Sequence, residues 1–354
     1  MEPEVKIAME TDADVWNRIV ASSSHGSLPH TWSWLKILET HTKTKLYPLI
    51  VYNGTEPLGI YPLFYQKKGY IKSVFSPPPH SGLLALGPVI ANYDHLKQNK
   101  KEHVYTQLQE TTNDFIKNEI KADYITISLP FGLHDPRPFT WTGYEITPKY
   151  DYVTDLSCGY TELWKQLKAE LRQSITRAEK KGVLVETGQK EDLELLFSLM
   201  KKRYEEQNMV LPISKEYLLE VYSAYKDNFH IFVGKYQEET VTGIIHVAYK
   251  DRFFSWIGNV RSPVQISPSP NDLVRWGSIK FASEQGYKEY IQMGAAGNIK
   301  RHAHYNKFNP ALNIRFIARR YSASARFMEK GYINFVKPVS SQITLFKRKM
   351  KRSE

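Results

Sequence analysis

Two stretches of the sequence, "LYPLIVYNGTEPLGIYPLFY" at residues 46–65 and "FHIFVGKYQEETVTGIIHVAY" at residues 229–249, follow one pattern. Each predicts a β-strand, a polar turn and a second strand that is entered through a glycine, Gly59 or Gly243. A single shared hairpin could arise by chance. The segments around the hairpins therefore decide whether the likeness reflects a duplicated unit.

These flanking segments match in the same order. Helical patterns precede the first hairpin at about 12–21 and 31–41, and the second at about 191–206 and 214–226. A helix and a buried strand follow each hairpin, at about 97–119 with "YITISL" and at about 271–285 with "YIQMG". The order helix, helix, antiparallel strands, helix, strand thus occurs twice. It predicts an α+β fold built from two copies of one unit.

The two copies meet near "PKYDYVTDLSCGY" at residues 148–160. We therefore predict an N-terminal domain over 1–155, a C-terminal domain over 156–325 and a basic C-terminal segment over 326–354. A chain of 354 residues suits two packed domains better than one core.

A basic helix opens the second copy. Its apolar residues recur three and four positions apart, which predicts one amphipathic helix that ends at a left-handed Gly182, before a strand begins. The apolar face comprises Leu163, Leu167, Leu171, Ile175 and Ala178. The remaining arc carries Lys165, Lys168, Arg172, Arg177, Lys180 and Lys181. These cations either form a solvated face or bind an anionic ligand, and the helix alone leaves both interpretations open.

The composition restricts the partners and the compartment. Lysine and arginine number 48 against 37 aspartate and glutamate, which favours anionic partners such as nucleic acid, nucleotides or an anionic membrane surface. A single cysteine, Cys158, excludes an internal disulfide and a cysteine-rich zinc site, and we predict no metal site. The sequence shows neither a signal peptide nor an apolar run long enough to cross a bilayer. We expect a cytoplasmic protein without integral membrane contact, with peripheral association with an anionic membrane left open.

Four segments resemble, in the right order, motifs of the FemAB-type peptidyltransferases and the related double-GNAT acyltransferases of the cellulose-biosynthesis type. They are "GSLPHTWSWLKIL" (26–38), "LRQSITRAEKKGV" (171–183), "NDLVRWGSIKFASEQGYKEYIQMGAA" (271–296) and "YNKFNP" (305–310). The resemblance spans most of residues 15–315. It implies two tandem GNAT-like domains, each a mixed, mostly antiparallel sheet flanked by helices.

The resemblance also implies a function in cell-envelope, peptidoglycan or polysaccharide synthesis. The expected enzyme is an acyl or aminoacyl transferase that forms an amide on an amine of an anionic, nucleotide-linked precursor. The expected co-substrate is an acyl-CoA or an aminoacyl-tRNA, and no other cofactor is implied. Two alternatives stay open: a non-catalytic tRNA- or nucleic-acid-binding module that keeps the fold, and a structural or regulatory partner.

Phosphates of donor or acceptor are expected to bind Arg172, Arg177 and Lys180, because arginine and lysine make charge-assisted hydrogen bonds to phosphate. Arg172 matches the first arginine of the family helix. Thr176 stands where the family has its second arginine, which weakens phosphate binding.

A second predicted cluster carries the chemistry. Lys307 would hold a donor phosphate or stabilise the oxyanion on the attacked carbonyl, and Tyr305, where the family often has lysine, would donate a neutral hydrogen bond. Phe308 belongs to the same motif. Three further aromatic residues, Trp34, Tyr204 and Trp256, occupy family-like positions expected to border the cleft.

Ordinary acetyl-CoA-dependent GNAT enzymes carry a glycine-rich loop that binds pyrophosphate, and neither copy has it. The segment before the helix at 271 reads "NVRSPVQISPSP" (259–270), whose prolines interrupt the series of N–H donors such a loop supplies. A standard small-molecule acetyltransferase is therefore disfavoured, although CoA could bind in another manner. His246, on a predicted amphipathic strand, is expected to pack rather than act as a base.

Overall fold

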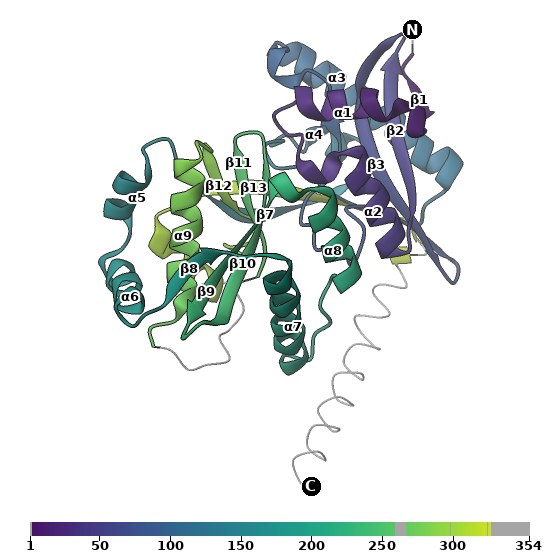
Figure 1. The fold of residues 1–354 in the computed structure, drawn as a ribbon. Coiled ribbons are helices and arrows are strands. Elements are labelled where there is room, and N and C mark those ends of the chain that lie inside the picture. The colour runs from purple at the N-terminus through teal and green to yellow at the C-terminus, as the bar shows by residue number, and fades with distance from the viewer. Residues whose placement is uncertain (1, 259–266, 298, 324, 327–354) are drawn as a thin grey trace.

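The computed structural model describes residues 2–258, 267–297, 299–323 and 325–326. Most of the proline-rich segment 259–270 and nearly all of the predicted basic segment 326–354 lie outside the described residues. The described strands form one continuous mixed sheet in the order β1-β2-β3-β4-β6-β13-β7-β12-β11-β10-β9-β8, with β5 paired to β3. Helices lie against both faces of this sheet in two lobes (Figure 1).

The first lobe follows the order predicted for the first copy. Its helices are α1 (Ala13–Ser22), α2 (Trp32–Thr42), α3 (Gln98–Phe115) and α4 (Arg137–Trp141). Its strands are β1 (Glu4–Ile7), β2 (Lys45–Asn53), β3 (Glu56–Lys68), β4 (Ile71–Ser76), β5 (Val89–Ile90) and β6 (Tyr124–Ser128). Gly59 of β3 is needed for packing, because a Cβ there would lie 2.4 Å from the Val89 carbonyl oxygen of β5.

The second lobe repeats the order. Its helices are α5 (Tyr160–Gln166), α6 (Ala169–Lys180), α7 (Lys190–Glu206), α8 (Lys215–Ala224), α9 (Pro270–Glu284) and α10 (Ile299–Tyr305). Its strands are β8 (Leu184–Thr187), β9 (Phe229–Tyr236), β10 (Glu239–Tyr249), β11 (Arg252–Gly258) and β12 (Glu289–Gln292). A Cβ on Gly243 of β10 would lie 2.7 Å from the Leu196 side chain of α7. The duplicated α+β unit is therefore confirmed, and both hairpin glycines admit a neighbouring element.

The two lobes exchange strands where they meet. The sheet centre consists of β7 (Glu145–Asp155) and β13 (Ala311–Tyr321), which pair antiparallel along nearly their whole length. On its other side β7 pairs with β12 of the second lobe, whereas β13 pairs with β6 of the first. The last described strand thus returns to the first lobe, and the domain limits at 155 and 325 stay a prediction.

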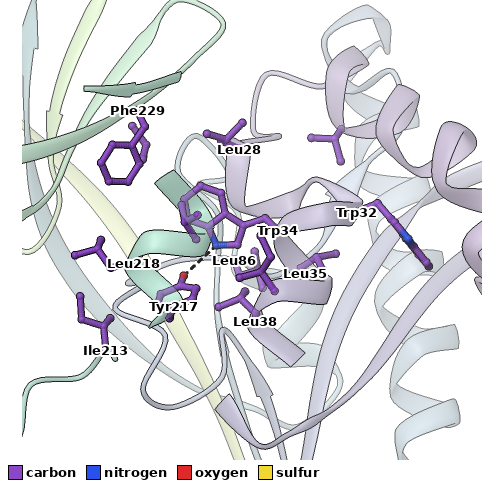
Figure 2. Packing of buried hydrophobic residues seen from close by; sticks show 14 of the residues in the cluster. Leu28, Trp32, Trp34, Leu35, Leu38, Leu86, Ile213, Tyr217, Leu218 and Phe229 are labelled. Carbon is purple, nitrogen blue, oxygen red and sulfur yellow. Dashed lines mark hydrogen bonds between the residues drawn. The ribbon is translucent and has the colours of Figure 1, made fainter. Parts of the chain in front are cut away.

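A shared hydrophobic core joins the lobes. It brings α1 and α2 of the first lobe against α7, α8, β9 and β10 of the second. At its centre Trp34 is fully buried, and its Nε1 donates a hydrogen bond to the Tyr217 hydroxyl at 3.1 Å across the lobe boundary (Figure 2). Two further cores lie within the lobes, one under α3 and one under α6 and α9.

The predicted single basic helix is wrong, because the structure has two helices, α5 and α6. Leu167 and Lys168 between them are extended, with ψ of 144° and 140°. The apolar spacing continues across the break, since Leu163 before it, Leu167 within it and Leu171 after it enter the same core. The apolar pattern therefore predicted the buried face correctly but not the break between α5 and α6. The left-handed glycine is confirmed, with Gly182 at φ +86°.

Candidate active site between the two lobes

A pocket of about 60 Å³ lies between the lobes, and we call it the inter-lobe pocket. The first lobe contributes the segments 27–30, 82–85 and 130–131. The second lobe contributes Val247, Phe254, Ser255, Trp256 and Met293. Most of these side chains are apolar, so a ligand held here would be largely withdrawn from water.

The second lobe opens its sheet at this pocket. β11 remains paired with β10 as far as Gly258, but its parallel pairing with β12 covers only residues 252–254. Ser255 and Trp256, the next residues of β11, line the pocket together with Met293, which follows β12. Backbone groups on the β12-facing edge of residues 255–258 therefore have no β12 partner, and an unpaired strand edge can hydrogen-bond a ligand.

A buried ion pair at the lobe boundary, Asp151 with Arg315, holds both walls of this pocket, and we call it the seam pair. Asp151 on β7 is fully buried and Arg315 on β13 is 3% exposed, with Nε to Oδ2 at 3.1 Å. Arg315 Nη1 also donates to the Leu84 carbonyl and the Ser128 hydroxyl, both at 2.7 Å. Asp151 Oδ1 accepts the Gly294 N–H at 2.7 Å. The pair thus ties the 82–85 wall to the turn after β12.

His30 lies on the pocket wall, but its ring nitrogens are already engaged. Nδ1 accepts the Ser27 N–H at 3.1 Å, so the ring proton is on Nε2, which donates to the Leu86 carbonyl at 3.0 Å. Burial lowers the pKa of His30 to about 4, which keeps the ring neutral at pH 7. His30 therefore fixes the loop rather than serving as a base.

His246 is buried on β10, where its Nε2 lies 2.9 Å from the Tyr290 hydroxyl. Burial, reinforced by the nearby Arg275 charge, lowers the pKa of His246 well below its usual value. The ring stacks on Phe253 with centroids 4.7 Å apart. It packs in the core, as the sequence predicted.

The three predicted aromatic residues lie in three different places. Trp256 lines the inter-lobe pocket, and its Nε1 donates to the Gly82 carbonyl at 3.2 Å. Trp34 lies behind it in the shared core, with the two ring centroids 5.5 Å apart. Tyr204 is half-buried near the end of α7 and is absent from the described pocket wall.

The predicted catalytic cluster lies beside α9, and its residues are absent from the described inter-lobe pocket wall. Tyr305 ends α10, Lys307 lies in the following turn, and Phe308 is buried in the core of the second lobe. Lys307 is about one-third exposed and faces Glu170 of α6 at 3.4 Å. The structure therefore brings the three residues together, while their catalytic role stays a prediction.

Arg275 of α9 is a functional candidate that the sequence analysis missed. It is 1% exposed, its Nε and Nη1 have no hydrogen-bond partner in the described chain, and its Nη2 has only a long 3.4 Å contact to the Tyr305 hydroxyl. Its guanidinium carbon lies 4.5 Å from the Tyr305 ring centroid and 6.0 Å from that of Phe308. An unpaired buried cation is costly, so this arrangement favours an anionic ligand.

Other polar groups of the second-lobe interior also have no hydrogen-bond partner among the described residues. The amide nitrogen and oxygen of the Gln292 side chain on β12, and the Thr154 hydroxyl on β7, are buried without a hydrogen bond in the described chain. Thr154 of β7 is the backbone pairing partner of Tyr290 on β12. Gln292 lies two residues after Tyr290 on β12, so both side chains point to the same face of the sheet. A signal for Arg275 existed in the sequence, because "LVRWG" places an arginine inside an apolar stretch of a helix.

The basic residues of α6 are less free than the sequence implied. Arg172 Nη1 donates to the carbonyls of Lys165 and Leu167, at 2.8 and 2.5 Å, and so caps the end of α5. Arg177 is exposed and bonds the Gln173 carbonyl of its own helix, and Lys180 is exposed. A 3.0 Å hydrogen bond from the Lys168 N–H to the Lys307 carbonyl joins the two predicted clusters.

Within the described ranges, no group of three or more His, Cys, Asp or Glu residues is arranged to hold a metal ion. In the same ranges, no helix combines the length and apolar character needed to cross a membrane.

Residues 165–302 match the family described as the acetyltransferase (GNAT) domain. No curated protein sequence matches the chain. Among solved structures, FemX is 14% identical, with 88% of this chain and 96% of FemX covered at a TM-score of 0.66. A tandem GNAT protein from the clavulanic acid biosynthesis pathway is 10% identical, with 90% and 98% covered at 0.55. L-PGS from Bacillus licheniformis is 15% identical, with 91% and 97% covered at 0.52.

These likenesses extend along almost the whole chain, whereas the matched domain covers its second lobe. They confirm the predicted architecture of two GNAT-like units in tandem. The chain therefore has the fold of FemX and of the tandem GNAT protein, and its residues 165–302 match the acetyltransferase (GNAT) domain.

Proposed function

We propose that this protein forms an amide by transferring an acyl or aminoacyl group to an amine in the inter-lobe pocket. The observation that carries the proposal is that β11 runs past its last β12 partner at a pocket walled by both lobes. Each substrate can approach from its own lobe, and the β11 edge beyond Phe254, which has no β12 partner in the described chain, can bind the donor's carbonyl and amide groups.

Amide formation from a thioester or activated ester needs positioning more than side-chain chemistry. Holding a neutral amine next to the carbonyl supplies much of the rate enhancement, and backbone N–H groups on the free edge can stabilise the oxyanion. His30, the imidazole on the described pocket wall, has both nitrogens engaged. We therefore expect the amine to enter unprotonated, with its proton passing to substrate or solvent.

The proposed donor is an acyl-CoA or an aminoacyl-tRNA, and the proposed acceptor is an anionic cell-envelope or polysaccharide precursor. All of these carry phosphate or carboxylate groups. Arg275 supports an anionic ligand better than Arg172 does, because Arg172 is committed to two carbonyl oxygens, while Nε and Nη1 of Arg275 have no hydrogen-bond partner in the described chain. Tyr305, over the Arg275 guanidinium, would then contact the same anion, as would Lys307 if it leaves Glu170.

A direct test measures product formation by mass spectrometry with panels of acyl-CoAs, aminoacyl-tRNAs and amine acceptors. Ala85 lines the pocket, so Ala85→Trp should fill it and abolish transfer. Thr55→Trp, at an exposed turn of the first lobe, serves as the matched control and should retain activity. Full activity in Ala85→Trp would place the chemistry elsewhere.

The alternative function, a non-catalytic nucleic-acid-binding module, predicts different results. It predicts steeply salt-dependent RNA binding without any transfer product. Absence of product with every donor, together with such binding, would replace the transferase proposal by this one.

A further inference from the structure

A second cavity, of about 360 Å³, lies in the first lobe and shares no lining residue with the inter-lobe pocket. Its size falls within the range of small-molecule sites, roughly 300–1,000 Å³. One wall is a single stripe of α3 made by Gln98, Lys101, Glu102 and Tyr105, and we call the cavity the α3 pocket.

The α3 wall of the pocket holds a buried donor that has no partner in the described chain. Tyr105 is 2% exposed, and its hydroxyl is buried without a hydrogen bond in the described chain. Burial raises the pKa of Tyr105 well above its usual value, so the hydroxyl keeps its proton. An unsatisfied buried hydroxyl costs about 1–3 kcal/mol, and a ligand or a water in the pocket would remove that cost.

A hydrogen-bonded charge network joins the α3 wall to the segment 135–137. Arg137 donates from Nε and Nη2 to the two carboxylate oxygens of Asp135, at 2.9 and 2.8 Å. Its Nη2 also reaches Glu102 Oε1 at 2.7 Å, and Gln98 Nε2 donates to the same oxygen at 3.0 Å. These bonds fix the wall, and no described hydrogen bond uses Arg137 Nη1, Glu102 Oε2 or Gln98 Oε1.

Two further groups line the pocket with unused capacity. Lys101 Nζ lies 4.5 Å from the Tyr93 ring centroid, and no described ion pair involves it. His134 Nδ1 lies 3.1 Å from the Ile314 carbonyl. Because a carbonyl only accepts, Nδ1 carries the proton, and the Nε2 lone pair is left as an acceptor. The cavity is therefore lined by both donors and acceptors.

The formal charges around the pocket cancel, since Lys101 and Arg137 balance Glu102 and Asp135. An anion would approach two carboxylates, and a cation would approach an ammonium and a guanidinium. A neutral ligand rich in hydroxyls, each of which donates and accepts, fits this wall without a charge penalty. We propose that the α3 pocket binds a neutral sugar ring, with the Tyr105 hydroxyl bonded to one sugar oxygen.

The pocket lies next to the proposed reaction site. Pro130 and Phe131 line the inter-lobe pocket, and Gly132 and His134 of the same loop line the α3 pocket. A sugar here could belong to a larger acceptor or be free. The binding site itself does not depend on the transfer reaction.

The test measures the binding of matched sugars to the full chain by NMR titration at pH 6.5. The probes are N-acetylglucosamine (neutral), glucosamine (cationic) and glucuronate (anionic), with the disaccharide of N-acetylglucosamine as a probe for a longer glycan. We expect saturable binding of the neutral sugar, with both charged probes at least about fivefold weaker. Tighter binding of the disaccharide would indicate a glycan, and equal binding a single sugar unit.

Two tyrosine variants make the test specific. Tyr105→Phe should weaken neutral-sugar binding about fivefold to tenfold, because one hydrogen bond is lost. Tyr144→Phe is the matched control, since Tyr144 is also buried against Phe139 but is absent from the α3 pocket wall. Urea unfolding should show both variants folded.

Absence of saturable binding by any neutral probe, equal effects of the two variants, or tighter binding of a charged probe would each overturn the proposal. The assay uses no acyl donor, so its failure leaves the transfer proposal untouched, and failure of transfer leaves this one untouched.

Discussion

Replacing Arg315 with methionine tests whether the seam pair stabilises the junction of the two lobes. The substitution removes the partner of Asp151, which is fully buried and would keep only the Gly294 N–H as a described partner. Leaving one charge of a buried pair without its partner typically costs about 3–5 kcal/mol. We expect Arg315→Met to lower the free energy of unfolding by about that amount, because Leu84 and Ser128 also lose a donor.

The assay is urea unfolding at pH 7.5, followed by tryptophan fluorescence and by far-UV circular dichroism. Coincident transitions are required, because a chain of 354 residues can unfold in more than one step. Arg319→Met is the matched control on the same strand, since Arg319 is half-buried and makes one 3.3 Å bond to Thr147. We expect it to cost less than about 1 kcal/mol.

A double variant isolates the electrostatic contribution. Asp151→Asn in the Arg315→Met background removes the orphaned charge while its amide oxygen can still accept the Gly294 N–H. The double variant should therefore be more stable than Arg315→Met alone, by about 1–3 kcal/mol. The reasoning would be refuted if Arg315→Met cost no more than Arg319→Met. It would also be refuted if the double variant lost as much stability as Arg315→Met and Asp151→Asn, measured singly, lose in sum.

Three further predictions use other parts of the structure. Burial lowers the pKa of His25 to about 3 and of His30 to about 4, below the usual 6.5, so the unfolded state binds more protons under pH 6.5. The free energy of unfolding should be highest above pH 6.5 and about 2 kcal/mol lower per histidine at pH 5. A urea midpoint that stays constant over that interval would contradict this. Arg275→Met should raise the free energy of unfolding by about 1–3 kcal/mol and weaken binding of the phosphate-bearing substrate at least about tenfold, as judged by urea unfolding and titration, whereas unchanged binding would remove Arg275 from the site. Arg172→Ala should cost about 1–2 kcal/mol because it uncaps α5, while the exposed Arg177→Ala should change stability little; equal effects in urea unfolding would remove the capping role.

The helices and strands of both lobes could be read from local patterns. Apolar residues at helical and strand spacing mark which side of each element is buried, and this depends on neighbours within a few residues. Gly182 illustrates the point, because its φ of +86° is a local requirement that the sequence signals directly. The break between α5 and α6 escaped prediction, since the apolar spacing runs through Leu167 as if one helix continued.

The candidate site was predicted in part. Trp256 lines the inter-lobe pocket, and Tyr305, Lys307 and Phe308 form one cluster, so several marked positions do gather in the second lobe. Arg275 was missed because its importance lies in two guanidinium nitrogens that have no hydrogen-bond partner in the described chain, and that depends on its whole surroundings.

The sequence by itself determined the duplicated order of helices and strands, because each element carries its own periodicity and end signals. The tertiary structure alone decided that β13 returns to the first lobe and that Asp151 meets Arg315 beneath the pocket. Those contacts join residues more than a hundred positions apart. They are selected by the burial and pairing of the folded sheet as a whole, which no local pattern encodes.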